Sequence, residues 1–205
     1  SGNKIFVSET EEIIIALNIG TSAKGCDPAE ECGSKKLSRA DWEDLKKEHI
    51  AEHRRHYGVM SLELPFESPD IPTDERMRNL RSGKEDPAAA LLYFNYGRYL
   101  LCASSANGEL PANLQGKWNE DVKPAWQCDY HLNINLQMNY WPAEAAGMHN
   151  YVEALLKYLE RFVSHARQTA QDLYGCKGIL LPHATDAWGR ATPEAYGWAA
   201  WTAGA

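Results

Sequence analysis

Apolar residues divide the chain into a short β-like beginning and a longer helical remainder. Lys4–Ser8 and Glu11–Ser22 are rich in Ile, Val and Leu, which predicts two strands joined by Glu9 and Thr10. Two strands do not make a stable sheet alone. We therefore expect them to belong to the end of a larger β domain, or to an edge packed on the helical remainder. Gly25–Lys36 is predicted to be a loop from its composition.

Helical spacing and capping residues predict four helices after this β-like region, over residues 38–57, 73–83, 86–104 and 150–175. Asp86 offers an N-cap carboxylate and Pro87 suits the first helical position, so the third helix should start there. Asn150 and Glu153 form a capping pattern for the fourth helix, and Gly175 should end it. The apolar stripe of this fourth helix is predicted to be Leu155, Leu156, Leu159, Phe162 and Val163. The chain is therefore expected to be mainly α, with long polar loops of the kind that usually carry function.

The charge of the chain argues against two classes of partner. It carries 21 Lys and Arg against 28 Asp and Glu, a formal net charge of −7, with a pI near 5.5. Nucleic acid or an anionic membrane needs a basic face, and no basic cluster extends beyond Arg54 and Arg55. No apolar run approaches the roughly 20 residues that span a bilayer. We expect no nucleic acid and no membrane as partners, while the oligomeric state stays open.

Cysteine and histidine spacing does not point to a metal site or a disulfide framework. The five cysteines are irregularly spaced and include no CxxC pair. Cys26 and Cys32 could pair in an oxidising compartment, and this stays open. His49 and His53 are one helical turn apart and could share a metal, but no third ligand lies nearby and a solvated helix face is favoured. We expect no metal and no cofactor.

The most informative segment lies between Asn113 and Glu144. From Asp129 to Asn139 polar and apolar residues alternate, so an extended chain would place the polar ones on one side. The polar positions are Asp129, His131, Asn133, Asn135, Gln137 and Asn139. Alternation alone favours a half-buried strand with a wet face, but Asn is poor in strands. Amides and an imidazole donate and accept hydrogen bonds without a fixed charge, as sugar hydroxyls or a positioned water require.

Aromatic residues point to the same kind of ligand. The chain has 7 Trp and 10 Tyr against 4 Phe, a tilt toward rings with a polar handle. The C–H bonds of a sugar pack on such a ring while its hydroxyls bond at the edge. Trp118, Trp126, Tyr140 and Trp141 flank the polar positions, and together these residues favour a polyol site.

Four strings in the second half of the chain carry a family resemblance. They are Asn113-Leu-Gln-Gly-Lys-Trp-Asn119, Asp129-Tyr-His-Leu-Asn-Ile-Asn135, Asn139-Tyr-Trp-Pro-Ala-Glu144 and His183-Ala-Thr-Asp-Ala-Trp-Gly-Arg190. Together they closely resemble the inverting 1,2-α-L-fucosidases of glycoside hydrolase family 95. Residues 72–76 and 93–105 match this family as well, and the resemblance runs from about residue 12 to the end.

The resemblance implies a fold that the hydrophobic pattern alone does not give. Residues 1–36 would end an N-terminal β-sandwich domain, residues 37–85 would form a linker region with a helix, and residues 86–205 would open an (α/α)6 catalytic barrel. The expected fold class is thus mainly α: a partial (α/α)6 barrel preceded by the last strands of a β-sandwich domain and a helical linker. The family also favours an extracellular or periplasmic location, although the chain shows no signal peptide.

The same resemblance assigns site residues. Asn133 and Asn135 would hold the catalytic water, with a carboxylate elsewhere polarising their amides. His131 matches a residue that lines the fucose pocket. Further substrate-binding candidates are His183, Asp186 and Trp201. The implied activity is removal of terminal α-1,2-linked L-fucose from an oligosaccharide by an inverting mechanism.

The general acid and the assisting carboxylate of this family lie downstream of the matched motifs and are not found before Ala205. Glu144, Asp129, Asp186 and Glu194 could substitute, but a helix-start or structural role is favoured for Glu144. The apolar ending over residues 197–205 has no cap or polar tail. We therefore expect a fragment that is inactive alone. An α-L-galactosidase of the same family and a non-catalytic carbohydrate-binding protein stay open as alternatives.

Overall fold

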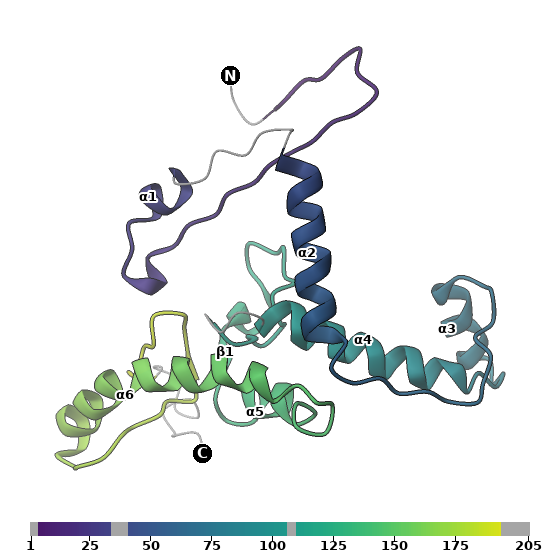
Figure 1. Cartoon of the computed structure of the whole chain (residues 1–205). Helices are drawn as coiled ribbons and strands as arrows, with labels where there is room; N and C mark the ends of the chain where they lie inside the picture. Colours follow the sequence, from purple (N-terminus) through teal and green to yellow (C-terminus); the bar gives the residue numbers. More distant parts are fainter. Residues whose placement is uncertain (1–3, 34–40, 106–109, 194–205) are drawn as a thin grey trace. The chain divides into compact units, whose positions relative to one another are not determined.

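The computed structural model describes residues 4–33, 41–105 and 110–193, and helices dominate these ranges (Figure 1). The chain divides into two compact units, residues 1–52 and 53–205. The expectation of a mainly α chain is confirmed. Within the described ranges no helix is both long enough and apolar enough to serve as a membrane span.

The first unit begins with extended chain that forms no sheet. Residues 4–21 contain no β-strand, and Figure 1 draws them as a plain trace. The strands predicted over Lys4–Ser8 and Glu11–Ser22 are therefore wrong as local structure. The physical reason is the absence of a hydrogen-bonded neighbour: Ile5 and Phe6 are 87% and 88% exposed, so nothing in the described structure covers their apolar side chains. Their assignment to a β-sandwich domain stays a prediction.

A short helix replaces part of the predicted loop in the first unit. After the 3-10 turn η1 (Ser22–Lys24), helix α1 spans Pro28–Gly33. The Asp27 carboxylate accepts hydrogen bonds from the backbone N–H groups of Ala29 (2.7 Å) and Glu30 (3.4 Å). An Asp cap followed by proline is a helix start, so the sequence carried this signal within its Gly- and Lys-containing stretch.

Helix α2 (Asp41–Tyr57) ends where the sequence predicts, immediately before Gly58. A Cβ atom at Gly58 would lie 2.6 Å from the backbone oxygen of Arg54, so glycine is needed at this exit. In the second unit the end of α2 is fastened to α4 (Ala88–Ser105). The Tyr57 hydroxyl donates to the Asn95 carbonyl at 2.8 Å, and buried Arg98 donates to the Tyr57 carbonyl at 2.8 Å.

The start of α4 is fixed by a buried ion pair with α3 (Thr73–Arg81). Arg76 donates to both carboxylate oxygens of Asp86, at 2.7 and 2.8 Å, and to the hydroxyl of Ser68 at 3.0 Å. The same carboxylate accepts the backbone N–H of Ala89 at 3.1 Å, which makes Asp86 the N-terminal cap that the sequence predicts. The hydrogen bond from Arg76 lowers the pKa of Asp86, and Asp86 in turn raises the pKa of Arg76.

Helix α6 (Val152–Tyr174) confirms most of the predicted apolar stripe, because Phe162 is buried and Leu155 and Leu159 pack against the core. Its buried residues recur every four positions and are Ala154, Tyr158, Phe162, Ala166 and Ala170. Leu156 is the member of the predicted stripe that is exposed. The predicted Asn150 cap does not form: the 3-10 turn η4 (His149–Tyr151) leads directly into α6. The helix ends before Gly175, whose φ of 61° confirms the predicted stop.

Tyr140 joins three parts of the core. It ends helix α5 (Asn135–Tyr140), and its hydroxyl accepts the backbone N–H of Ala112 and shares a hydrogen bond with the Ser105 hydroxyl, both at 2.8 Å. Burial raises the pKa of Tyr140, so the hydroxyl stays protonated at neutral pH. This bond network connects α4, α5 and the segment that leads from Ala112 into the site.

The Asp86–Arg76 pair predicts a pH-dependent stability. Asp86→Asn is expected to destabilise the full-length protein at neutral pH and to flatten its pH dependence. Because the folded pKa of Asp86 lies below the usual 3.8, the stabilisation is complete above that value and is lost as the pH falls through the folded pKa. Urea-unfolding midpoints between about pH 7 and about pH 3 should therefore converge for the two proteins on acidification.

Asp74→Asn is the matched control, because Asp74 pairs with Arg78 at 2.7 Å on the exposed surface. It should shift the midpoint little at any pH. An Asp86→Asn difference that stays constant across the acid range would contradict the assignment.

Candidate functional site

The polar segment from Asp129 to Asn139 is not one extended strand. Strand β1 covers Tyr130–His131, a turn follows over residues 132–134, and α5 begins at Asn135. The Gln137 side chain donates to the Leu132 carbonyl at 2.7 Å, which closes the turn onto the helix. The conditional prediction of a single polar ladder is thus wrong, because asparagine prefers turns and helix starts to strand interiors.

Four predicted residues nevertheless line one pocket of about 570 Å³. Its lining consists of Leu114, Gln115, Trp126, His131, Asn133, Asn135 and His183. Asn133 is exposed and Asn135 is half-buried, so both amides are accessible from the pocket. The change from strand to turn to helix brings His131 and the two asparagines to the same wall. Their chemical roles stay predictions.

Strand pairing brings His183 to the pocket from 52 residues farther along the chain. β1 pairs antiparallel with β2 (Ala184–Thr185), with His131 opposite Ala184. The backbone N–H of Leu132 donates to the His183 carbonyl at 2.8 Å. The two imidazole rings lie edge to face, with centroids 5.3 Å apart and planes at 87°.

Two oxygen atoms lie close to one ring nitrogen of His131. Its Nε2 lies 2.9 Å from a carboxylate oxygen of Asp129 and 3.3 Å from the Trp126 carbonyl oxygen. A carbonyl oxygen can only accept, so the Trp126 contact places a proton on Nε2. The Asp129 carbonyl also accepts the backbone N–H of Leu114 at 2.9 Å, which ties the segment to the turn that carries Gln115.

A segment whose backbone lies in the left-handed conformation precedes β1 and includes Trp126; we call it the strap. Within the 3-10 segment η3 (Ala125–Cys128) and its end, Trp126, Gln127 and Cys128 have φ values of 53°, 60° and 50°. The left-handed conformation costs roughly 1–2 kcal/mol for each residue that carries a side chain. It persists where the surrounding structure enforces it. The Cys128 thiol, 3.4 Å from the Asn113 side-chain oxygen, and the Trp126 carbonyl anchor the strap.

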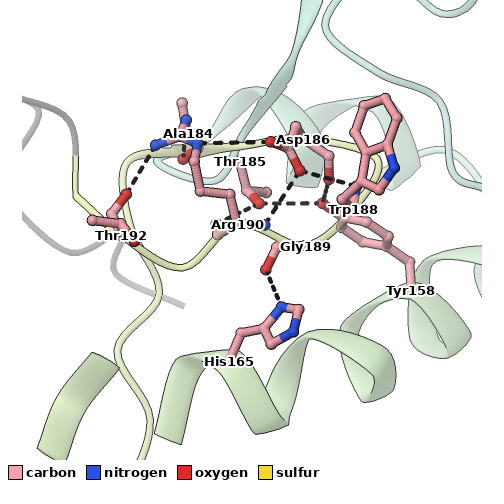
Figure 2. A network of polar contacts seen from close by, with 9 residues as sticks. All are labelled: Tyr158, His165, Ala184, Thr185, Asp186, Trp188, Gly189, Arg190 and Thr192. Carbon is pink, nitrogen blue, oxygen red and sulfur yellow. Dashed lines mark hydrogen bonds and ion pairs between the residues drawn. The ribbon is translucent and has the colours of Figure 1, made fainter. Parts of the chain in front are cut away.

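Asp186 lies in the turn after β2 (Figure 2). It does not belong to the described pocket lining. One carboxylate oxygen accepts the backbone N–H groups of Trp188 (2.9 Å) and Arg190 (3.3 Å), and the other lies 3.7 Å from the Arg190 guanidinium. Its backbone oxygen accepts the Tyr158 hydroxyl of α6 at 2.5 Å. These contacts show that Asp186 closes its own turn, and its predicted place against sugar stays a prediction. Trp201, the remaining candidate, lies outside the described residues.

Further contacts hold this turn on α6. The buried Thr185 hydroxyl donates to the Arg190 carbonyl at 2.7 Å, and His165 Nδ1 lies 2.9 Å from the Gly189 carbonyl oxygen (Figure 2). A Cβ atom at Gly189, whose φ is 77°, would lie 3.0 Å from the Phe162 ring. The turn is therefore a closely packed element that fixes β2 and, through it, His183.

The chemistry of the described lining is neutral. It combines three amides, two imidazoles, one indole and one leucine, and no carboxylate belongs to it. Such a surface can orient hydroxyl groups or a water molecule through paired donors and acceptors. Among the described residues, no three His, Cys, Asp or Glu side chains gather in a way that could hold a metal ion.

Comparison with known proteins identifies the family. The glycosyl hydrolase family 95 catalytic domain matches residues 41–205. The chain belongs to glycoside hydrolase family 95. The resemblance carried by the four sequence strings is thereby confirmed.

Three similar proteins are named fucosidases. The chain is 33% identical over 223 aligned residues to Alpha-L-fucosidase 2 of Arabidopsis thaliana, covering 99% of this chain and 26% of the relative. It is 40% identical to Probable alpha-fucosidase A of Aspergillus niger, covering 71% of this chain and 19% of the relative. The Aspergillus oryzae protein of the same name is 38% identical over 76% of this chain and 22% of its own length. The chain thus spans about a quarter or less of these relatives.

The contacts of Asp186 predict how two substitutions at this position differ in their free energy of unfolding. Asp186→Ala should lower the free energy of unfolding of the full-length protein by about 1–2 kcal/mol, because two backbone N–H groups lose their acceptor. Asp186→Asn keeps an acceptor oxygen and should recover at least half of that loss. Chemical denaturation at neutral pH measures both. Equal unfolding free energies for Asp186→Ala and the wild type would remove the structural role assigned here.

Proposed function

We propose that this family 95 chain carries the water-binding half of an active site that removes terminal α-1,2-linked L-fucose with inversion. The observation that carries the proposal is the placement of Asn133 and Asn135 on one pocket wall, beside two imidazoles and an indole. The names of the relatives, all fucosidases, support the choice of sugar.

Inverting hydrolysis requires two catalytic groups on opposite faces of the sugar. A basic group activates a water molecule on one face of the sugar, and an acid on the other face protonates the leaving oxygen, roughly 6.5–9.5 Å away. Two amides can orient the water through their oxygens and N–H groups, but an amide is a feeble base near neutral pH. A carboxylate must therefore polarise Asn133 or Asn135 as the reaction proceeds.

We assign the general acid and that assisting carboxylate to other parts of the full-length protein. The described pocket lining holds no carboxylate, and the chain spans about a quarter or less of its relatives. Glu144 is exposed and lies outside the lining. The Asp129 carboxylate approaches His131, and the Asp186 carboxylate accepts a backbone N–H within its own turn. None of these three carboxylates belongs to the described lining, and Glu194 lies outside the described residues.

Replacement of either asparagine tests the water-holding role. In the full-length enzyme, Asn133→Ala and Asn135→Ala should each lower kcat on 2′-fucosyllactose by roughly 10²–10⁴-fold, the size of a lost general-base contribution. KM should change much less, because the water rather than the sugar loses its partner. Initial rates of fucose release and the anomeric configuration of the first product, followed by NMR, give both quantities and the stereochemistry.

Asn150→Ala is the matched control, since Asn150 is exposed and outside the described lining. It should leave kcat unchanged. Normal turnover in both pocket variants would refute the water-holding role. Faster release of L-galactose from the matching galactoside would favour the α-L-galactosidase, which differs by a hydroxyl on C6. Tight glycan binding without any hydrolysis by the wild-type enzyme would favour a binding protein.

A further inference from the structure

We infer that Gln137 is a positioning residue that acts through Asn133, an inference that rests on the proposed hydrolysis. Asn133 and Asn135 line the pocket, whereas Gln137 lies outside the described lining and donates back to the turn before α5. Its Nε2 lies 2.7 Å from the Leu132 carbonyl oxygen, which belongs to the peptide group that joins Leu132 to Asn133. Because a peptide group is planar and includes the next Cα atom, Gln137 holds the plane from which the Asn133 side chain extends.

Backbone hydrogen bonds fix the chain on both sides of this peptide group. The Leu132 N–H donates to the His183 carbonyl at 2.8 Å, and the Ile134 carbonyl accepts the Met138 N–H at 2.9 Å at the start of α5. The side-chain bond from Gln137 holds the peptide group that lies between these two points. Without that bond, the peptide plane could turn about its two flanking single bonds while the backbone bonds on either side persist.

The Asn133 side chain has no anchor of its own among the described residues. It is exposed, and its amide forms no hydrogen bond with another described residue. Its place on the pocket wall is therefore set by the backbone, whereas Asn135 begins α5 and takes its position from the helix. A displacement of about 1 Å can cost a catalytic group roughly 10²-fold in rate. The geometry of the proposed water site therefore depends on the contact from Gln137.

The other half of the Gln137 amide supports this assignment. Its Oε1 is buried and has no hydrogen-bond partner among the described residues. A buried acceptor without a partner costs free energy that an apolar side chain of similar size would avoid. The N–H donor is therefore the part of the amide that the described fold uses, and its acceptor lies in the turn that carries Asn133.

Gln137→Met tests the positioning role in the full-length enzyme, because methionine has a similar length and no N–H donor. It should lower kcat on 2′-fucosyllactose by roughly 10- to 100-fold, the cost of a misplaced catalytic group. KM should stay within about twofold of the wild-type value, because the sugar keeps its contacts. Gln137→Glu keeps the shape of the side chain but presents an oxygen to the Leu132 carbonyl at neutral pH. It should show the same loss in kcat, even if the methionine variant does not fold.

A double mutant separates positioning from a general loosening of the fold. The enzyme with both Asn133→Ala and Gln137→Met should have the kcat of Asn133→Ala alone, because the group to be positioned is already gone. Gln168→Met is the matched control, since Gln168 is exposed on α6 and donates to a carboxylate oxygen of Asp172 at 2.7 Å. It should leave kcat and KM unchanged.

Thermal unfolding of each variant shows whether it is folded, and only folded variants are compared. A normal kcat in a folded Gln137→Met or Gln137→Glu enzyme would overturn the inference while leaving the proposed hydrolysis intact. Losses that multiply in the double mutant would overturn it as well. Normal turnover by Asn133→Ala would instead remove the water-holding role, and the inference with it.

Discussion

The site depends on the pairing of two very short strands. β1 and β2 contribute two residues each, yet their antiparallel register sets His131 opposite Ala184 and joins Leu132 to the His183 carbonyl. A two-stranded ladder of this length has little stability of its own. It is held because Tyr130 and Thr185 are buried and because the turn after β2 is bonded to α6 through Tyr158. The helical packing thus stabilises the strands, and the strands place the imidazoles.

Buried tyrosines supply the polar connections in this packing. Tyr158 joins α6 to the Asp186 turn, and Tyr140 joins α5 to α4 and to Ala112. Burial raises the pKa of Tyr130 to about 12 and raises that of Tyr158 as well, so these hydroxyls remain neutral hydrogen-bonding groups at physiological pH. A buried tyrosine fills core volume and satisfies a polar group at once.

Local signals predicted the helices well and the strands poorly, for a physical reason. The Asp86 cap and the Gly175 stop act within one turn of chain, and both form as predicted. A strand instead requires a partner that composition does not reveal, and the apolar residues before Gly20 lack one in the described structure. The core-facing side of α6 was predicted in part: Leu155, Leu159 and Phe162 lie at the core, whereas Leu156 is exposed. The buried alanines of this helix gave no signal in a stripe chosen for large apolar residues.

Four of the predicted residues lie together, but not in the predicted geometry, and their roles stay predictions. Asn133, Asn135, His131 and His183 do line one pocket, although a turn and a helix start replace the expected strand. The signal was the choice of neutral, two-way hydrogen-bonding groups, which is independent of secondary structure. Gln115 stood within a recognised string and Trp126 among the flanking aromatics, but only the fold shows that both reach the pocket. For Asp186, the sequence could not separate a sugar contact from a turn acceptor, since one carboxylate suits either.

The carboxylate of Asp129 approaches Nε2 of His131 at 2.9 Å, and His131 also faces the Trp126 carbonyl. The described pocket lining contains no carboxylate, so under the proposed mechanism this wall would orient the water without activating it. Under the proposed mechanism, activation would require a second carboxylate brought up by another part of the enzyme, so that hydrolysis depends on assembly of the whole active site around this wall.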